Sequence, residues 1–261
     1  MIKSLYTAAS GMHAQQMNLD NIANNIANAN TTGFKRTRVE FQDLVYETLR
    51  GTSATEQGTT VPAELQIGGG TKSVATVKNF ESGSPQETGN PLDLMINGDG
   101  FFQVLMPDGT LAYTRDGSWK ISADGQVVNA NGLTMEPPLT IPQDATAIMV
   151  NTDGRVLIQT QASTEPTEIG RIELARFINP AGLTNLGDNL YKQTVASGDP
   201  IVAQAGLDGM GTINQGYLEA SNVKIVNEMI AMITAQRSYE LNSKSVKTAD
   251  DMIGIATNLK R

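Results

Sequence analysis

The chain has 261 residues, a formal net charge of −8 at pH 7 and an isoelectric point near 4.7. This acidic balance argues against nucleic acid as a partner, because phosphate contacts require clustered Lys and Arg. The chain contains no cysteine, which excludes disulfides, thiol chemistry and thiolate metal sites. No apolar run approaches a membrane span, and we expect no general secretory signal peptide, because the first residues lack a continuous apolar core.

Residues 3 to 29 are predicted to form a helix. Many of the positions between the apolar ones hold Asn or Gln, and Asn is a poor helix former, so this helix should depend on packing for its stability. Gly33 is the natural left-handed residue after its C-terminal end. One apolar stripe follows the helical spacing that keeps a single face toward a partner helix: Leu5, Met12, Leu19, Ile22 and Ile26.

Residues 35 to 50 are predicted to form either a second helical stretch or an extended arm. Residues 51 to 58 are rich in Gly, Ser and Thr, which is typical of a loop, and residues 68 to 70 are a candidate hinge of three glycines. The segment from 46 to 68 is longer than an ordinary connection, so we expect it to have a role of its own. Six side chains are available to anchor it: Tyr46, Leu49, Val61, Pro62, Leu65 and Ile67.

From about residue 71 the apolar period changes to two, which predicts strands. Asn-Gly and Asp-Gly pairs recur at short intervals and are typical of tight hairpin turns. The runs between them predict strands at 73–80, 101–105, 148–150, 171–178 and 190–195. This pattern indicates a small antiparallel sandwich or barrel.

The end of the chain is predicted to form one long helix, capped by Ser221 or Asn222 and reaching about Leu259. Its apolar stripe is Ile225, Met229, Met232, Tyr239, Val246 and Ile253. The predicted fold class is therefore α+β and mainly β, with the terminal helices paired in a coiled-coil-like domain and a central antiparallel β domain. We expect three regions: residues 1–30 with 221–261, a junction of 31–78 with 203–220, and an outer β domain at 79–202.

The residues that could carry chemistry are few. His13 is the one histidine and lies in the first predicted helix, where a surface or interface role is the more common. Asp93, Asn97 and Asp99 suggest a calcium loop but miss the EF-hand spacing. The other candidate aspartates precede glycine, where turn geometry already explains them. We therefore expect no catalytic residue, cofactor or metal. The alternatives are a secreted cell-wall hydrolase and a β-rich binding module.

Five motifs carry a family resemblance from one end of the chain to the other. The first is the run NLDNIANNIANANTTGFK at residues 18–35, followed by INGDGFFQV at 96–104 and YTRDGSW at 113–119. The last two are QGYLEASNV at 215–223 and QRSYELNSK at 236–244. In order and in content they resemble the signatures of the flagellar rod and hook proteins. The length and the segment from 46 to 68 resemble the distal rod members, and a proximal rod subunit is the alternative within the family.

The resemblance implies a structural subunit that polymerises into a rigid helical tube and transmits torque from motor to hook. It implies copies of the same chain, proximal rod proteins, the hook protein and the P- and L-ring proteins as partners, without nucleic acid or membrane insertion. The subunit would be exported by the flagellar type III system without a cleaved signal peptide, to the periplasm-spanning rod of the basal body. The helical stripes would be the subunit-packing residues, and the segment from 46 to 68 would supply rigidity.

Overall fold

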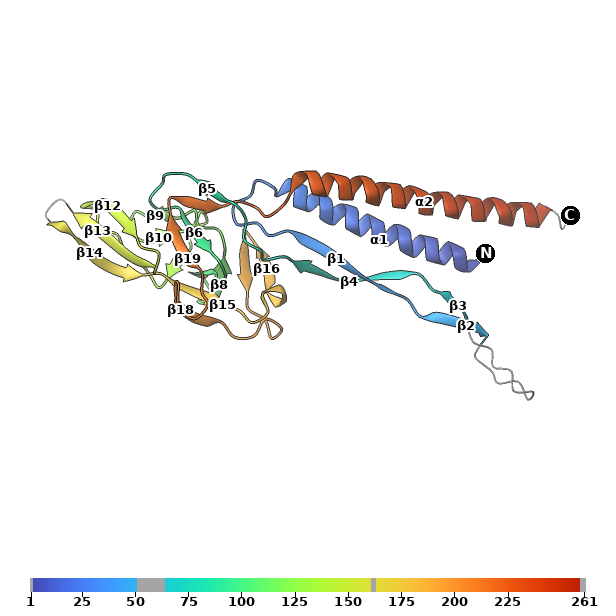
Figure 1. Ribbon diagram of the computed structural model, residues 1–261, viewed down its shortest axis with the longest axis horizontal. Helices are drawn as coiled ribbons and strands as arrows, with labels where there is room; N and C mark the ends of the chain where they lie inside the picture. Colours follow the sequence, from blue (N-terminus) through green and yellow to red (C-terminus); the bar gives the residue numbers. More distant parts are fainter. Residues whose placement is uncertain (1, 51–63, 161–162, 259–261) are drawn as a thin grey trace. The chain divides into compact units, whose positions relative to one another are not determined.

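The computed structural model of the protein describes residues 2–50, 64–160 and 163–258 (Figure 1). These residues divide into two compact units. The helical unit combines the two terminal helices with the strands between residues 37 and 77. The β unit combines residues 28–36 with residues 78–223.

In the helical unit, α1 (Ile2–Ala27) and α2 (Ile225–Asn258) lie side by side (Figure 1). The predicted helices at both ends of the chain are thus confirmed, but the predicted cap of the second one is wrong. Residues 221 to 224 are not helical, and the Glu228 N–H donates to the Lys224 carbonyl at 3.1 Å. The side chain of Asn222 binds other parts of the backbone, and the Ser221 hydroxyl accepts from the Val223 N–H at 3.3 Å.

Two strand pairs complete the helical unit. Strand β1 (Thr37–Asp43) pairs with β4 (Thr71–Lys78), and β2 (Tyr46–Arg50) pairs antiparallel with β3 (Leu65–Gly68). Of the two predictions for residues 35 to 50, the extended arm is therefore correct. The β1 strand packs on α1, where the side chains of Asn21 and Asn25 donate to the Thr37 carbonyl at 2.9 and 2.8 Å.

The β unit is built on a seven-stranded antiparallel sheet with the order β16-β17-β8-β7-β11-β10-β9. Its strands are β7 (Phe102–Leu105), β8 (Leu111–Thr114), β9 (Lys120–Ile121), β10 (Val127–Val128), β11 (Thr134–Glu136), β16 (Thr184–Gly187) and β17 (Leu190–Lys192). A three-stranded antiparallel sheet follows the order β12 (Ala145–Val150), β13 (Arg155–Thr160) and β14 (Ser163–Arg171). Three further antiparallel pairs join β15 (Glu173–Arg176) to β18 (Ile201–Gln204), β6 (Leu94–Asn97) to β19 (Thr212–Gln215), and β5 (Pro85–Glu87) to β20 (Tyr217–Glu219).

The core of the β unit lies between these sheets. Trp119 meets Phe102 edge to face, with ring centroids 5.5 Å apart, and both side chains are almost fully buried. Around them pack aliphatic side chains from several strands, among them Ile96, Val104, Val156, Leu174 and Ile213. The predicted mainly β fold with helices at the two ends of the chain is confirmed.

One predicted turn has a different physical basis. Gly98, Gly109, Gly125, Gly132 and Gly154 have positive φ, as the Asn-Gly and Asp-Gly pattern predicts. Gly117 does not have a positive φ. Instead, a Cβ at Gly117 would lie 1.6 Å from the Leu94 carbonyl oxygen, so glycine is required there by the close approach of another strand.

Candidate assembly surfaces and junction network

The contact between α1 and α2 is made largely by small and amide-bearing residues. On α2, Glu228, Ala235 and Ala249 are at most 4% exposed, and Asn242 lies on the same seven-residue row. Asn25 of α1 donates from Nδ2 to Glu228 Oε2 at 3.2 Å. Two heptads away, a Cβ at Gly11 would lie 2.8 Å from Asn242 Nδ2. The helices are therefore antiparallel and stay in step, with Gly11 providing room for the Asn242 amide.

The predicted stripe residues lie beside this row. On α1, Ile22 is buried and the other four are half-buried. On α2, Met232, Val246 and Ile253 are half-buried, whereas Ile225, Met229 and Tyr239 are 41%, 52% and 39% exposed. Within one subunit the stripes thus keep much of their apolar area free, and their role in contacts between subunits stays a prediction. The inner row was missed because Glu, Ala and Asn at a seven-residue period do not register as an apolar pattern.

The first third of α2 also carries an exposed apolar surface, which we call the outer face. It consists of Val226, Met229, Ile230 and Ile233, and each of these side chains is more than half exposed. Because an exposed patch of large apolar side chains is uncommon on a protein that works alone, this face is a candidate for contact with another chain.

The segment from 46 to 68 includes an exposed hairpin. Tyr46, Leu49, Leu65 and Ile67 are 51%, 53%, 57% and 43% exposed, respectively. The Tyr46 ring packs on Gly68, and an ion pair between Lys3 and Glu47 connects the hairpin to α1. The other two anchor residues, Val61 and Pro62, lie outside the described residues. The hairpin has apolar side chains that its own subunit does not cover.

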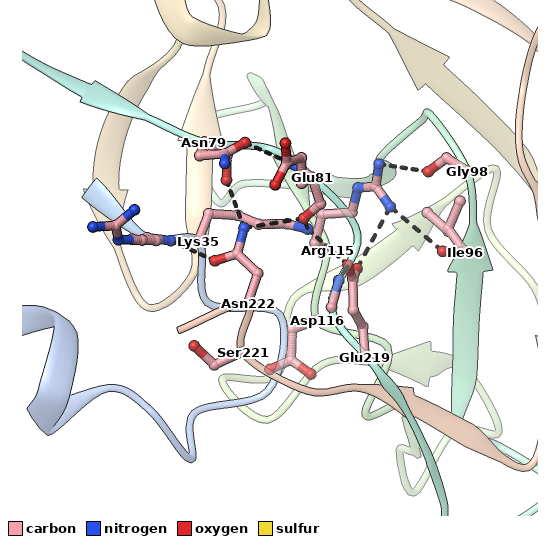
Figure 2. A network of polar contacts seen from close by, with 12 residues as sticks. Lys35, Asn79, Glu81, Ile96, Gly98, Arg115, Asp116, Glu219, Ser221 and Asn222 are labelled. Atoms are coloured by element: carbon pink, nitrogen blue, oxygen red, sulfur yellow. Dashed lines mark hydrogen bonds and ion pairs between the residues drawn. The ribbon is translucent and has the colours of Figure 1, made fainter. Parts of the chain in front are cut away.

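A buried polar network lies in the β unit, where the segment that follows α1 meets the segment that precedes α2 (Figure 2). Lys35, Arg115 and Glu219 are at most 3% exposed. The Lys35 Nζ donates to Glu219 Oε1 and to the Glu81 carbonyl, both at 2.7 Å. The Arg115 Nη1 lies 3.5 Å from Glu219 Oε2, and Nη2 donates to the Gly98 carbonyl at 2.8 Å. Glu219 therefore bonds two cations from different parts of the chain.

The electrostatics of this network are unbalanced, since two cations share one carboxylate. Burial lowers the pKa of Lys35, Glu219 raises it, and Arg115 lowers it further. Burial also lowers the pKa of Arg115, and Glu219 again acts in the opposite direction. For each cation, the Glu219 carboxylate is the largest influence that opposes the effect of burial on its pKa.

Backbone contacts connect the same segments. The Asn222 Oδ1 accepts from the Arg36 N–H at 2.7 Å, and its Nδ2 donates to the carbonyls of Asn79 and Glu81 at 2.9 and 3.1 Å. The Gly33 N–H donates to the Glu219 carbonyl at 2.8 Å. Gly33 has φ +68°, as predicted for a left-handed residue, and a Cβ there would lie 2.7 Å from the Asp116 nitrogen. Both segments are therefore tied to the sheets by side-chain and backbone bonds.

The sequence predicted none of these network residues as a site. Lys35, Arg115, Glu219 and Asn222 all lie in motifs that carry the family resemblance, at residues 18–35, 113–119 and 215–223. The available clue was that Lys35, Arg115 and Glu219 are charged residues in motifs made mostly of uncharged ones. Only the fold shows that these motifs meet.

Two hollows open on the described part of the surface. One open hollow of about 750 Å³ has Asp199 and Lys192 in its lining, and a second of about 340 Å³ has Asp99, Arg115 and Arg176. Each lining has one carboxylate, whereas glycoside hydrolysis uses a pair. Within the described ranges, no group of His, Asp and Glu could hold a metal ion, and neither α1 nor α2 has an apolar window that could span a membrane.

Three family models match successive parts of the chain. Residues 5–35 match the flagella basal body rod protein model, and residues 95–158 match the flagellar hook protein FlgE/F/G D1 domain. Residues 214–259 match the C-terminal model of the flagellar basal body rod FlgEFG proteins. The buried polar network of Lys35, Arg115 and Glu219, which we call the junction network, joins two of these matched regions. Lys35 is the last residue matched by the first model, and Glu219 lies near the start of the last one.

Curated relatives match over nearly the whole chain. The flagellar basal-body rod protein FlgG of Borreliella burgdorferi is 51% identical over 265 residues, covering 100% of both chains. The FlgG proteins of Caulobacter vibrioides and Bacillus subtilis are 46% and 40% identical, covering at least 99% of this chain and 100% of theirs. The FlgF rod protein of Caulobacter vibrioides is 33% identical, covering 97% of this chain and 95% of its own length.

Proposed function

The chain belongs to the flagellar basal-body rod proteins, in the FlgG group of structural distal rod subunits, and we propose that it polymerises into a rigid helical tube that transmits torque from motor to hook. The observation that carries this proposal is the pairing of α1 and α2. Their contact is made largely by small and amide-bearing residues, so several large apolar side chains of α2, among them Val226, Ile230 and Ile233, remain exposed in the single subunit. A face of this kind gains stability when further helices cover it.

The predicted stripes supply the first contacts in this proposal. Met232, Val246 and Ile253 on α2, with Leu5, Met12 and Leu19 on α1, are half-buried and have area left for a neighbour. Head-to-tail contacts that do not close on themselves generate an open helical polymer. The domain scheme fits this role: residues 1–30 and 221–261 line the inner tube, and residues 79–202 face outward.

The hairpin of β2 and β3 supplies stiffness in this proposal. Its apolar side chains are exposed in the single subunit, so contact with an adjacent subunit would bury them. Such a strut would prevent neighbouring subunits from sliding past one another, whereas helices alone allow some sliding. The ion pair of Lys3 with Glu47 would fix the base of the strut to α1.

Location and partners follow from the family. The protein is a component of the flagellar basal body. We propose the proximal rod proteins, the hook protein and the P- and L-ring proteins as its neighbours, and the flagellar type III system as its export route. An α1 rich in amides is weak alone, which suits a subunit that travels unfolded and becomes ordered on docking.

Three other functions are weaker. A proximal rod role is disfavoured because the FlgF relative is 33% identical, against 40% to 51% for the FlgG relatives cited above. A cell-wall hydrolase would need a carboxylate pair in a cleft, and each of the two hollows has one carboxylate in its lining. A binding module has no use for an apolar helix pair at its termini. We therefore propose that the protein has no catalytic activity.

Electron microscopy of the purified protein at rising concentration tests the proposed function. We expect straight tubes above a threshold concentration, because polymer contacts form by mass action. A parallel sample contains the proximal rod and hook proteins of the same flagellum, which can act as nuclei for assembly. If the protein remains monomeric at every concentration even in that sample, polymerisation is contradicted. Incubation with purified peptidoglycan checks the absence of hydrolysis, and release of muropeptides that Asp99→Asn or Asp116→Asn abolishes would support the hydrolase instead.

A further inference from the structure

The outer face of α2 is free of charge as well as exposed. Val226, Met229, Ile230 and Ile233 are 68%, 52%, 59% and 53% exposed. Between residues 225 and 233 the one charged residue is Glu228, and it is 1% exposed because it turns inward to Asn25. The outer face is therefore a short apolar surface without an exposed charge. The neighbouring carboxylate, that of Glu228, lies on the side of the helix that contacts α1.

The complementary surface lies on α1 at the same level. Ala23 and Ala27 are exposed, and no residue from 21 to 27 is charged. The Asn25–Glu228 hydrogen bond places this end of α1 beside the start of α2, and the Gly11–Asn242 contact keeps the heptads in step further along. One helix thus presents large apolar side chains where the other presents exposed methyl groups.

We propose that the outer face of α2 packs onto Ala23 and Ala27 of a second copy of this chain. Large side chains fit between small ones at a close helix contact, because small residues leave grooves for them. The two surfaces differ from each other, so the contact is heterologous and repeats from copy to copy without closing. The inference rests on the proposed polymerisation and names the contact within it.

A second copy fits this face better than a lipid surface does. The face extends over eight residues, about 12 Å along the helix. Helices that lie on membranes carry Lys and Arg along the polar side of a longer apolar face. Here the nearest basic residues are Lys224 and Arg237, one beyond each end of the face, and the uncharged polar positions between them hold Asn227, Thr234 and Gln236.

Disulfide trapping tests the contact, and the absence of native cysteine makes every introduced thiol unique. Two single variants, Ala23→Cys and Ile230→Cys, are purified, mixed under assembling conditions and oxidised with diamide. The matched control mixes Ala9→Cys with Ile230→Cys. Ala9 is another exposed alanine of α1 and lies two heptads from Ala23, about 21 Å along the helix. We expect at least tenfold more mixed disulfide dimer from the 23/230 pair than from the 9/230 pair. A second pair, Ala27→Cys with Val226→Cys, repeats the test if one variant assembles poorly.

The outcomes separate this inference from the proposed function. The same mixtures are imaged before oxidation. Tubes that form without a preference for the 23/230 and 27/226 pairs overturn the proposed contact and leave polymerisation intact. Dimers of Ile230→Cys with itself in excess of the mixed dimer also overturn it, because they indicate a symmetric contact. Failure of the unsubstituted protein to form tubes overturns both.

Discussion

The Lys35 Nζ and the Glu219 Oε1 lie 2.7 Å apart, and both side chains are 1% exposed. They join a residue just after the first helix to one just before the last. Glu219 is also the carboxylate partner of the Arg115 guanidinium, at 3.5 Å, and accepts from the Gly83 N–H at 2.8 Å. Glu219 is therefore the one carboxylate that forms an ion pair with both buried cations of this network.

The first prediction is that Glu219→Ala strongly destabilises the β unit. Removing one partner of a buried ion pair costs about 3–5 kcal/mol, because the other charge stays buried without compensation. The control is Asp153→Ala, which removes the exposed ion pair to Arg155 and the Arg155 N–H bond to the same carboxylate, and it should cost much less because water screens exposed pairs. Urea unfolding followed by Trp119 fluorescence measures both. Equal losses in the two variants would show that the network contributes no more than a surface pair.

The second prediction concerns the close approach at Gly11. Gly11→Leu should separate the helices, because even a Cβ would lie 2.8 Å from Asn242 Nδ2. The control is Gly254→Ala on α2, where a Cβ meets nothing within 4 Å and the higher helix propensity of Ala should stabilise by up to about 1 kcal/mol. Hydrogen exchange of the two helices is the measurement. Unchanged protection in Gly11→Leu would mean that the helices tolerate a wider spacing.

The third prediction is a pH dependence from Lys78, which lies 4.8 Å from the Tyr191 ring centroid and 5.6 Å from that of Phe34. Burial lowers the pKa of Lys78 from 10.5 to about 8. Between these values the folded state binds fewer protons than the unfolded state, so the Lys78 contribution to stability increases as pH rises from about 8 toward 10.5. Burial also raises the pKa of Tyr191, which acts in the opposite direction only above its ordinary value of 10.

Lys78→Met removes this dependence. The unfolding free energy of the unsubstituted protein minus that of the variant should therefore increase between pH 7.5 and 9.5, whatever constant difference the lost side chain produces. Denaturant unfolding at four pH values in this range gives the slope. A difference that is flat or falls with pH would rule out Lys78 as a group whose charge is disfavoured in the fold.

Local patterns in the sequence predicted most of the fold. The helices were predicted because their apolar spacing is local, and strands such as β4 and β7 because alternation and Gly turns are local too. The cap of α2 was misplaced because Asn222, a good cap by residue type, instead binds backbone groups of Arg36, Asn79 and Glu81. The Asn222 side chain therefore forms a tertiary hydrogen bond to a residue more than 140 positions away instead of capping the helix.

The junction network and the inner helix row could not be predicted for the same physical reason. Lys35 and Glu219 are 184 residues apart, so no spacing rule connects them. Glu228, Ala235, Asn242 and Ala249 repeat every seven residues, but small and polar residues usually indicate an exposed face. Here Glu228, Ala235 and Ala249 are buried and Asn242 is half-buried, because α1 comes close to this row at Gly11 and Asn25.

The fourth prediction is that Met232→Asp or Ile26→Asp blocks polymerisation. Each side chain is half-buried in the single subunit, and a carboxylate forced into a dry contact costs several kcal/mol or becomes protonated. The penalty repeats at every subunit of a polymer. The control is Gln236→Asp, at an exposed polar position of α2. Electron microscopy scores the tubes and circular dichroism checks that the β unit still folds. Normal tubes in both Met232→Asp and Ile26→Asp would show that the stripes are not packing surfaces.

The last prediction assigns stiffness to the segment from Tyr46 to Gly68. Deleting residues 51 to 60, which lie outside the described residues, shortens this segment and leaves the paired strands β2 and β3 and their ion pair to α1 in place. Subunits should still be exported and polymerise, because the helix contacts are unchanged. The tubes should bend more easily, because the strut is shorter and the exposed Leu65 and Ile67 of the remaining hairpin cover a smaller area of the neighbour. Persistence length measured on electron micrographs gives the answer, with a Gly/Ser replacement of the same ten residues as the length-matched control. If both variants are as stiff as the unsubstituted tube, rigidity must come from the helices instead.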